Sequence, residues 1–237
     1  MVTTMKKAVL FLMVVLLMIG ACGCMQHRTE DNTKDNMINN MVQYMNEKYP
    51  DDTFNYKGPF GGGAGSSTKT IVVSSKKYPD ANIYVRHQFS EGDIYTDNYL
   101  GIKYTEQTKS AIKEVFDSVL SYDYLLFYDV EQFACPNKTG TMDFADYISS
   151  DESRIGFTVV VNGVIADKAT FENALKNKII DKGICCSATI YFDNGSGAFD
   201  KLEAEGLSGY TFKELYSDVF IFEMKSDKEF SSSQWGD

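Results

Sequence analysis

The sequence predicts an α+β fold in which an antiparallel meander sheet packs against helices. Hydrophobic residues make up 43% of the 237 positions and charged residues 24%, which allows a sizeable core. Aromatic residues, mostly Tyr and Phe, contribute 14% and suit sheet faces that pack on one side and meet water on the other. In the first half, a helical pattern precedes four strand-like segments, which is typical of a meander with helices on one face.

The folded domain is expected to span residues 35–225 and to begin with a helix over residues 37–49, where apolar residues recur at helical spacing before a proline. Strands are predicted over residues 53–56, 69–74, 82–89 and 93–99. The last two form a hairpin whose expected register sets Arg86 opposite Asp97, a favourable cross-strand pair.

The second half alternates helices and strands. A helix over residues 106–120, with Thr105 as its N-cap, has the clearest apolar stripe. Further strands are predicted over 124–130, 154–161, 184–192 and 219–224, and further helices over 143–148, 168–181, 199–205 and 211–216. Two subdomains meeting near residues 149–153 and one single domain both remain open. Residues 226–237 are polar, and we expect a flexible tail there.

Residues 1–21 have the pattern of an export signal. Lys6 and Lys7 precede an uncharged run over residues 8–19. At 1.5 Å per residue this run spans about 18 Å as a helix, well short of the ~30 Å hydrocarbon core of a bilayer. The pattern therefore disfavours a permanent transmembrane helix and favours a cleaved signal peptide.

The junction Ile19-Gly20-Ala21-Cys22 resembles the lipobox of bacterial lipoproteins: an aliphatic residue, two small residues and a cysteine. The resemblance covers the first 22 residues. It implies that the Cys22 sulfur receives a diacylglycerol and becomes the mature N-terminus, with residues 22–34 as a polar tether. Two acyl chains, at about 0.8 kcal/mol per buried CH₂, anchor a protein stably. We therefore expect a lipid anchor on the extracytoplasmic face of the cell membrane.

The domain is also similar to small uncharacterised lipoproteins of Gram-positive bacteria. The similarity lies in the lipobox, in the helix-then-meander layout, and in the segments Gly-Pro-Phe-Gly-Gly-Gly at 58–63 and Tyr-Thr-Asp-Asn-Tyr at 95–99. This resemblance carries no functional residues across to the chain.

The formal net charge of −10 argues against nucleic acid as a partner, because an acidic surface repels phosphate backbones. The charge is compatible with a cationic partner. The simpler interpretation, which we prefer, is a solvated acidic surface.

Three cysteines lie in the folded domain: Cys135, Cys185 and Cys186. Outside the cell a disulfide is permitted, so Cys135 could pair with one of the two neighbours. Adjacent side chains of a strand project to opposite faces, so only one of them can face Cys135. A bridge and buried free thiols both remain open. No Cys-x-x-Cys and no Cys/His spacing is present, so neither a metal nor a cofactor is predicted.

No motif in the sequence identifies a catalytic residue or a reaction. His87 shares a strand face with Ile83 and Val85, which favours a structural histidine. The glycine-rich run 61–69 lacks the Gly-Lys-Ser/Thr order of a phosphate-binding loop and is expected to connect two strands. Paired acids could support glycoside hydrolysis, and the candidates are Asp93 with Asp97, Asp143 with Asp146, Asp151 with Glu152, and Asp193 with Asp200.

The preferred functional hypothesis is a non-enzymatic envelope lipoprotein that binds a protein, a peptide or a wall component near the membrane. Its basis is the combination of an anchor, an acidic domain and no catalytic motif. One alternative is a cell-wall glycan hydrolase that uses paired carboxylates. Another is a lipoprotein that captures a solute for a transporter, which would need a deep cleft between two lobes.

Overall fold

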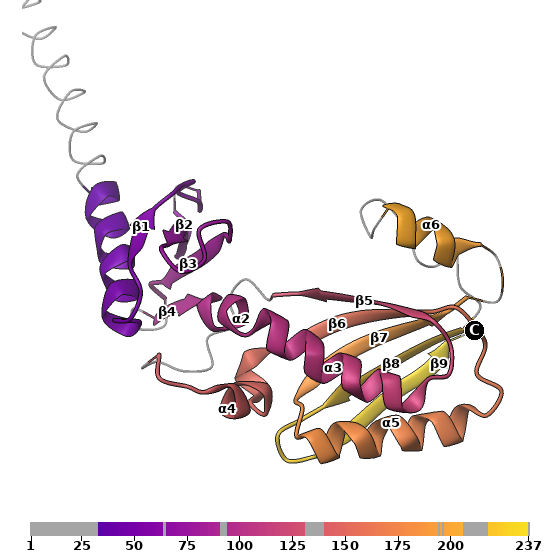
Figure 1. Ribbon diagram of the computed structural model, residues 1–237. Helices are drawn as coiled ribbons and strands as arrows, with labels where there is room; N and C mark the ends of the chain where they lie inside the picture. Colours follow the sequence, from indigo (N-terminus) through magenta and orange to yellow (C-terminus); the bar gives the residue numbers. More distant parts are fainter. Residues whose placement is uncertain are drawn as a thin grey trace, which may run out of the picture.

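The computed structural model describes residues 33–63, 65–90, 94–130, 140–193, 195, 197–205 and 218–236. The predicted signal peptide, Cys22 and Cys135 lie outside these residues. The described strands form one sheet of four strands and one of five, and helices pack on both sheets (Figure 1). The fold is therefore α+β, as predicted. Within the described ranges, no helix is both long enough and apolar enough to cross a membrane.

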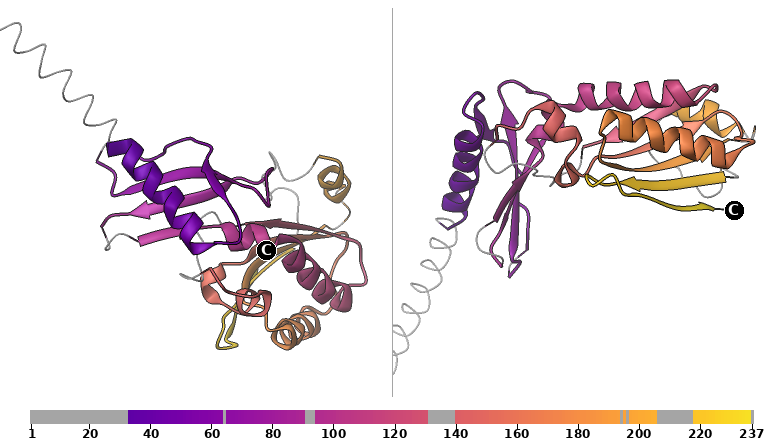
Figure 2. Two further views of the ribbon diagram at one scale, coloured as in Figure 1. Left: turned by 60° about the vertical axis from the view of Figure 1, so that its left-hand side comes forward. Right: turned by 90° about the horizontal axis from the view of Figure 1, so that it is seen from below.

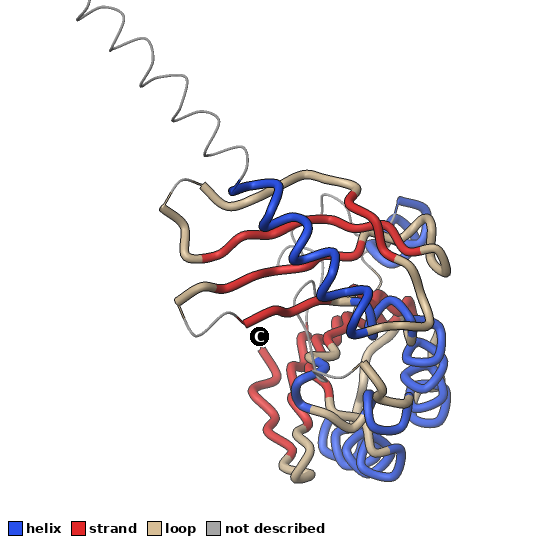
Figure 3. The backbone as a smooth tube through the Cα atoms, turned by 90° about the vertical axis from the view of Figure 1, so that its left-hand side faces the viewer, coloured by secondary structure: helices blue, strands red, loops and turns tan. Residues whose placement is uncertain are grey.

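The first unit is a helix at residues 33–48 packed on a four-stranded sheet. The strands are β1 (Phe54–Tyr56), β2 (Thr68–Ser75), β3 (Ile83–Gln88) and β4 (Ile94–Asp97). They follow one another as an antiparallel meander, and the helix lies across one face (Figure 3). Met41 and Met45 of the helix are fully buried against this face. The predicted helix and meander are confirmed.

The predicted register of the β3–β4 hairpin was wrong by one residue. In the structure Val85 lies opposite Asp97, and Arg86 lies opposite Thr96. A shift of one residue turns every side chain of a strand to the other face of its sheet. The observed register places Asp97 on the face that the helix covers, where the residue is 1% exposed. Contacts with the helix, rather than an Arg–Asp pair across the strands, therefore decide this register.

The second unit begins with α2 (Tyr99–Lys103) and α3 (Thr105–Val119). Its remaining elements, in chain order, are β5 (Tyr124–Asp129), α4 (Phe144–Ile148), the 3₁₀ helix η1 (Asp151–Ser153), β6 (Gly156–Val161), α5 (Lys168–Lys182), β7 (Cys186–Phe192), α6 (Ala198–Glu205), β8 (Asp218–Met224) and β9 (Phe230–Gly236). These elements match the predicted ones closely, except that the helix expected at 211–216 lies outside the described residues.

The five strands of the second sheet lie in the order β5-β6-β7-β8-β9. All neighbours are antiparallel except β6 and β7, which are parallel and are joined by α5. Helices α3 and α5 lie side by side on one face of the sheet (Figure 2). Helix α6 packs on the opposite face, where Phe199 and Leu202 contact Val160.

The strands divide into two sheets between β4 and β5, earlier than the predicted boundary at Ser149–Ser153. Residues 149–153 lie between α4 and β6, inside the second unit. The strands that flank them, β5 and β6, pair with each other, so a boundary there would cut a sheet. A single apolar core cluster includes residues of both units, from Ile38 to Met224.

The predicted flexible tail was wrong for residues 230–236, which form the edge strand β9. The ring of Trp235 lies 4.9 Å from that of Phe220 and stacks on Phe192 at 5.6 Å, between ring centroids. The ammonium of Lys168 lies 4.7 Å from the centre of the same indole. Aromatic packing at the end of the strand thus holds a segment whose polar middle resembles a tail.

Candidate functional site

Strand β5 is the outermost strand of the second sheet. The N–H of Asn162 donates to the carbonyl oxygen of Asp123 at 2.8 Å, so the backbone groups of every second residue from Asp123 onward point toward β6. Those of Tyr124, Leu126 and Tyr128 point the other way. No backbone group in the described part of the chain pairs with them. Such a free edge can accept a further strand.

The residues of β5 do not protect this edge. Its sequence is YLLFYD, five apolar or aromatic residues before Asp129, with neither lysine nor proline. Natural edge strands usually carry charged residues, proline or a bulge that discourages pairing with other chains. The opposite edge strand, β9, has the sequence FSSSQWG with four polar residues in its middle. Of these two edges, β5 is the one suited to contact with a partner.

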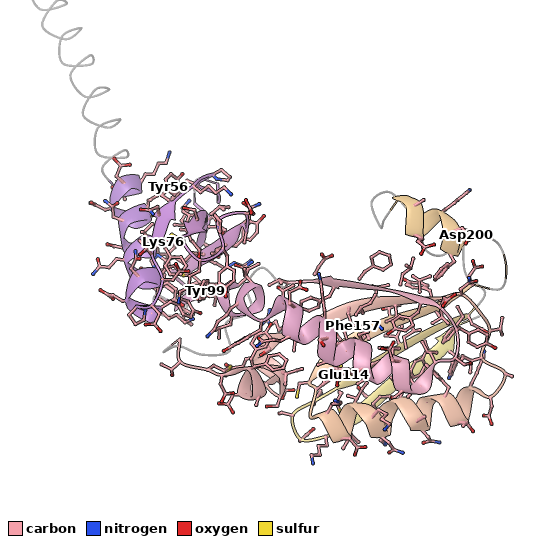
Figure 4. The ribbon with its side chains drawn as sticks, viewed as in Figure 1. Tyr56, Lys76, Tyr99, Glu114, Phe157 and Asp200 are labelled. Carbon is pink, nitrogen blue, oxygen red and sulfur yellow. The ribbon has the colours of Figure 1, made fainter. Side chains whose placement is uncertain are left out.

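Two helices turn this edge into a groove. Tyr124 and Leu126 pack with the core beneath α3, whereas Leu125 and Phe127 pack with Phe199 of α6 on the other face. The groove between α3 and α6 has a volume of about 1030 Å³ and follows the first half of β5. Figure 4 labels Glu114 on α3 and Asp200 on α6, the two helices on either side of β5.

The α3 wall of the groove is held by hydrogen bonds. The Lys113 ammonium lies 2.7 Å from Oδ2 of Asp117, and the Tyr124 hydroxyl donates to Oδ1 of Asp117 at 2.6 Å. These two bonds, that of Lys113 first, hold the pKa of Asp117 below its usual range. Asp117 is therefore an ionised acceptor rather than a proton donor, and Tyr124 links the edge strand to α3.

Most of the predicted acid pairs stabilise local structure. Asp97 is buried against Lys48, and Asp143 caps α4 by accepting a bond from the N–H of Asp146. Asp151 accepts bonds from Ser226. The buried Asp193 accepts bonds from the N–H groups of Gly195 and Phe199 and so fixes the approach to α6. Among these acids Asp200 lines the groove, and Asp93 lies outside the described residues.

Two other sequence motifs have the structural roles that we predicted. His87 is buried and stacks on Tyr95, with ring centroids 4.2 Å apart. The glycine-rich run connects β1 to β2, and the Lys69 ammonium donates to the carbonyl oxygens of Gly62 at 3.0 Å and Gly63 at 2.8 Å. In the described ranges, no group of three His, Cys, Asp or Glu residues is placed to hold a metal ion.

Cys185 and Cys186 are buried, and neither forms a disulfide with another described residue. The Cys185 thiol donates to the carbonyl oxygen of Ser149 at 2.9 Å. Burial, followed by the charge of Asp151, raises the pKa of Cys185 to about 11. Burial also raises the pKa of Cys186. Both thiols are protonated at neutral pH and are therefore poor nucleophiles. Because Cys135 lies outside the described residues, a disulfide to it stays a prediction.

Sequence reasoning missed the groove. The apolar run of β5 without lysine or proline was a usable signal, since this composition is unusual for an exposed edge. The order of strands in the sheet was not predictable, and that order places β5 at the edge.

Comparisons with models of protein families and with curated proteins found no match. Among solved structures, the chain is similar to a DUF5037 family protein from Ruminococcus gnavus ATCC 29149, whose crystal structure was determined at 2.55 Å resolution. The TM-score is 0.42 and the sequence identity 15%, over 83% of this chain and 95% of that one.

Proposed function

We propose that this protein is a membrane-anchored, extracytoplasmic lipoprotein that binds an extended peptide segment of an envelope protein. The peptide adds to the second sheet as a sixth strand along β5. The observation that carries this proposal is the apolar edge of β5 between α3 and α6, with which no other described strand pairs. The anchor rests on the lipobox at residues 19–22.

Strand addition assigns separate roles to backbone and side chains. The free N–H and C=O groups of Tyr124, Leu126 and Tyr128 supply main-chain hydrogen bonds, which give affinity for any extended chain. The side chains of the added strand alternate between the two faces of the sheet. One set meets α3 and the other meets α6, so the two helices select which peptides bind.

The edge is tested with three capped eight-residue peptides in which Val alternates with Lys, with Thr or with Glu. Binding to the full chain in detergent is measured by calorimetry. The tightest binder is then N-methylated on either alternate set of residues. Because only one set of N–H groups faces β5, methylation of that set should abolish binding and methylation of the other should leave it largely intact. Equal effects of the two methylated peptides would exclude strand addition.

A variant of β5 provides the matching test on the protein. Leu126→Pro removes an N–H that points away from β6, so the β5–β6 ladder remains. We expect peptide affinity to fall by roughly tenfold or more, since a main-chain hydrogen bond is lost and the ring blocks the edge. Leu126→Val keeps the N–H and should bind as the wild type does, with folding of both variants checked by circular dichroism.

The anchor is tested separately by expressing the full chain in a bacterium with Cys22 or with Cys22→Ser. Only the wild type should partition with membranes, and mass spectrometry should find a lipid-modified Cys22 at its mature N-terminus. Membrane partition of the serine variant, or a mature chain that begins elsewhere, would contradict the lipoprotein assignment.

The glycan-hydrolase alternative receives less support from the groove. A glycosidase needs one carboxylic acid that retains its proton, which requires a raised pKa. On the α3 wall the pKa of Asp117 is instead lowered by Lys113 and Tyr124. Asp117 is therefore unsuited to be that acid, and peptide binding remains the function that we propose.

A further inference from the structure

The two walls of the groove differ in charge. On α3, the ammonium of Lys113 pairs with Asp117 at 2.7 Å, and that of Lys109 lies 3.7 Å from Glu106. Each acid of α3 that lines the groove is thus accompanied by a lysine. This wall presents no net charge to a bound strand.

The wall on the α6 side is acidic. Asp123, Asp200 and Glu203 line the groove and are exposed, and in the described part of the chain no cation pairs with any of them. Asp200 and Glu203 are three residues apart on α6 and therefore share a face of the helix. Asp123 alternates with Leu125 and Phe127, so its side chain lies on the α6 side of the sheet.

An added strand would meet these walls with alternate residues. Side chains at one set of positions lie over the neutral α3 wall, near Leu120 at the end of α3 and Leu126 of β5. Side chains at the other set lie on the side where Asp123, Asp200 and Glu203 line the groove, and none of these acids forms an ion pair within the described residues. The acids would attract Lys or Arg at these positions and would repel Asp or Glu.

We infer that the peptide bound along β5 is basic on one face, with Lys or Arg at alternate positions and apolar or neutral residues between them. This inference rests on the proposed function. The free edge of β5 makes the site, and the unequal charge of its two walls selects the occupant.

The three alternating peptides test this directly. At low salt we expect the Lys/Val peptide to bind about tenfold more tightly than the Thr/Val peptide, and the Glu/Val peptide to bind most weakly. The differences should shrink at high salt, because ions screen exposed charges within about 3 Å at 1 M. N-methylation should act as before on whichever peptide binds.

A charge reversal on α6 should invert the preference. The double variant Asp200→Lys/Glu203→Lys is expected to bind the Glu/Val peptide more tightly than the Lys/Val peptide. The milder Asp200→Asn/Glu203→Gln should remove most of the preference. The matched control is Glu47→Lys/Asp80→Lys, which changes exposed residues of the first unit and alters the net charge of the chain equally. This control should keep the wild-type order.

The outcomes separate the two proposals. If the three peptides bind equally well, or if the control variant shifts the order as much as the α6 variant does, the inference of a basic peptide is overturned while strand addition stands. If none of the peptides binds, the proposed function itself fails.

Discussion

Lys48 and Asp97 form a buried ion pair between the N-terminal helix and β4. Their side chains are 2% and 1% exposed, and Nζ lies 2.8 Å from Oδ2. The hydroxyls of Tyr44 and Tyr49 also donate to the Asp97 carboxylate, each at 2.9 Å. The N–H of Tyr99 adds a further bond at 3.0 Å. Hydrogen bonds from protein donors thus replace water around the Asp97 carboxylate, as a buried charge requires.

Asp97→Asn should lower the free energy of unfolding by about 3–5 kcal/mol, because Lys48 would remain buried beside an uncharged partner. Urea titration followed by circular dichroism measures the change. The control is Asp117→Asn, which breaks the half-exposed pair with Lys113 and should cost no more than about 1 kcal/mol. Similar losses in the two variants would contradict the importance of the buried pair.

Asp52 links stability to pH. Burial alone would raise the pKa of Asp52, but hydrogen bonds from Ser75, Thr53, Tyr99 and Lys77 outweigh it and lower that pKa. The resulting stabilisation is fully present above the unfolded pKa of about 3.9 and is lost as the pH falls through the lower folded value. Asp52→Asn should therefore be less stable than the wild type at pH 7, and the difference should narrow on acidification. Urea midpoints measured from pH 7 down to pH 2 check this; a constant difference would contradict it.

Two glycines show how the ends of elements depend on space as well as on backbone angle. Gly140 has φ +73°, and a Cβ there would lie 2.0 Å from the carbonyl oxygen of Lys48, at the end of the helix at 33–48. Gly183 ends α5 with φ +64°, and a Cβ there would have no atom within 4 Å. Gly140 thus permits a close approach between segments of the two units.

Gly183→Ala should cost about 1–2 kcal/mol, which is the penalty for a left-handed alanine. Gly140→Ala should lower stability clearly more, because the new Cβ would also collide with the backbone carbonyl of Lys48. Thermal and urea unfolding of the two variants measures the difference. Equal losses would show that the approach of Gly140 to Lys48 contributes little to stability.

Elements with a regular spacing of apolar residues were predictable from the sequence. Elements whose position depends on contacts with distant segments were not. The helix at 33–48 and α3 follow the 3.6-residue spacing of apolar residues, whereas α5 buries one apolar residue per turn, at Phe171, Leu175 and Ile179. The register of β4 was not predictable, because Asp97 is buried by partners on a helix about fifty residues away. The strand at Trp235 was missed for a similar reason: the middle of its sequence is polar, and its docking depends on contacts of Trp235 with Phe192 and Phe220.

At the scale of the whole molecule, α2 connects the two units through buried side chains. Tyr99, Leu100 and Tyr104 are all buried and belong to the apolar cluster that includes residues of both sheets. The candidate groove likewise depends on the whole fold, because it forms only where β5, α3 and α6 meet. Residues close in sequence could suggest an unprotected strand, but not the two walls around it.

A continuous core predicts that the two units unfold together. Fluorescence of Trp235, the only tryptophan, reports on the second sheet, and far-ultraviolet circular dichroism reports on both units. The two urea transitions should coincide, as expected for a two-state protein. Leu100→Ala should lower the free energy of unfolding by about 2–5 kcal/mol, because it opens a cavity in the core next to α2. Separate transitions in the wild type would contradict a shared core.

The helix at 33–48 and α6 lie at opposite ends of the molecule (Figure 1, Figure 2). Since the proposed lipid on Cys22 precedes that helix in the chain, the first unit would act as a spacer between bilayer and groove. The groove would then bind its ligand at a distance from the lipid headgroups, among the polymers of the wall, and the ligand would need no affinity for lipid. The distance between the bilayer and the groove would depend on the fold of the first unit rather than on the length of the predicted tether.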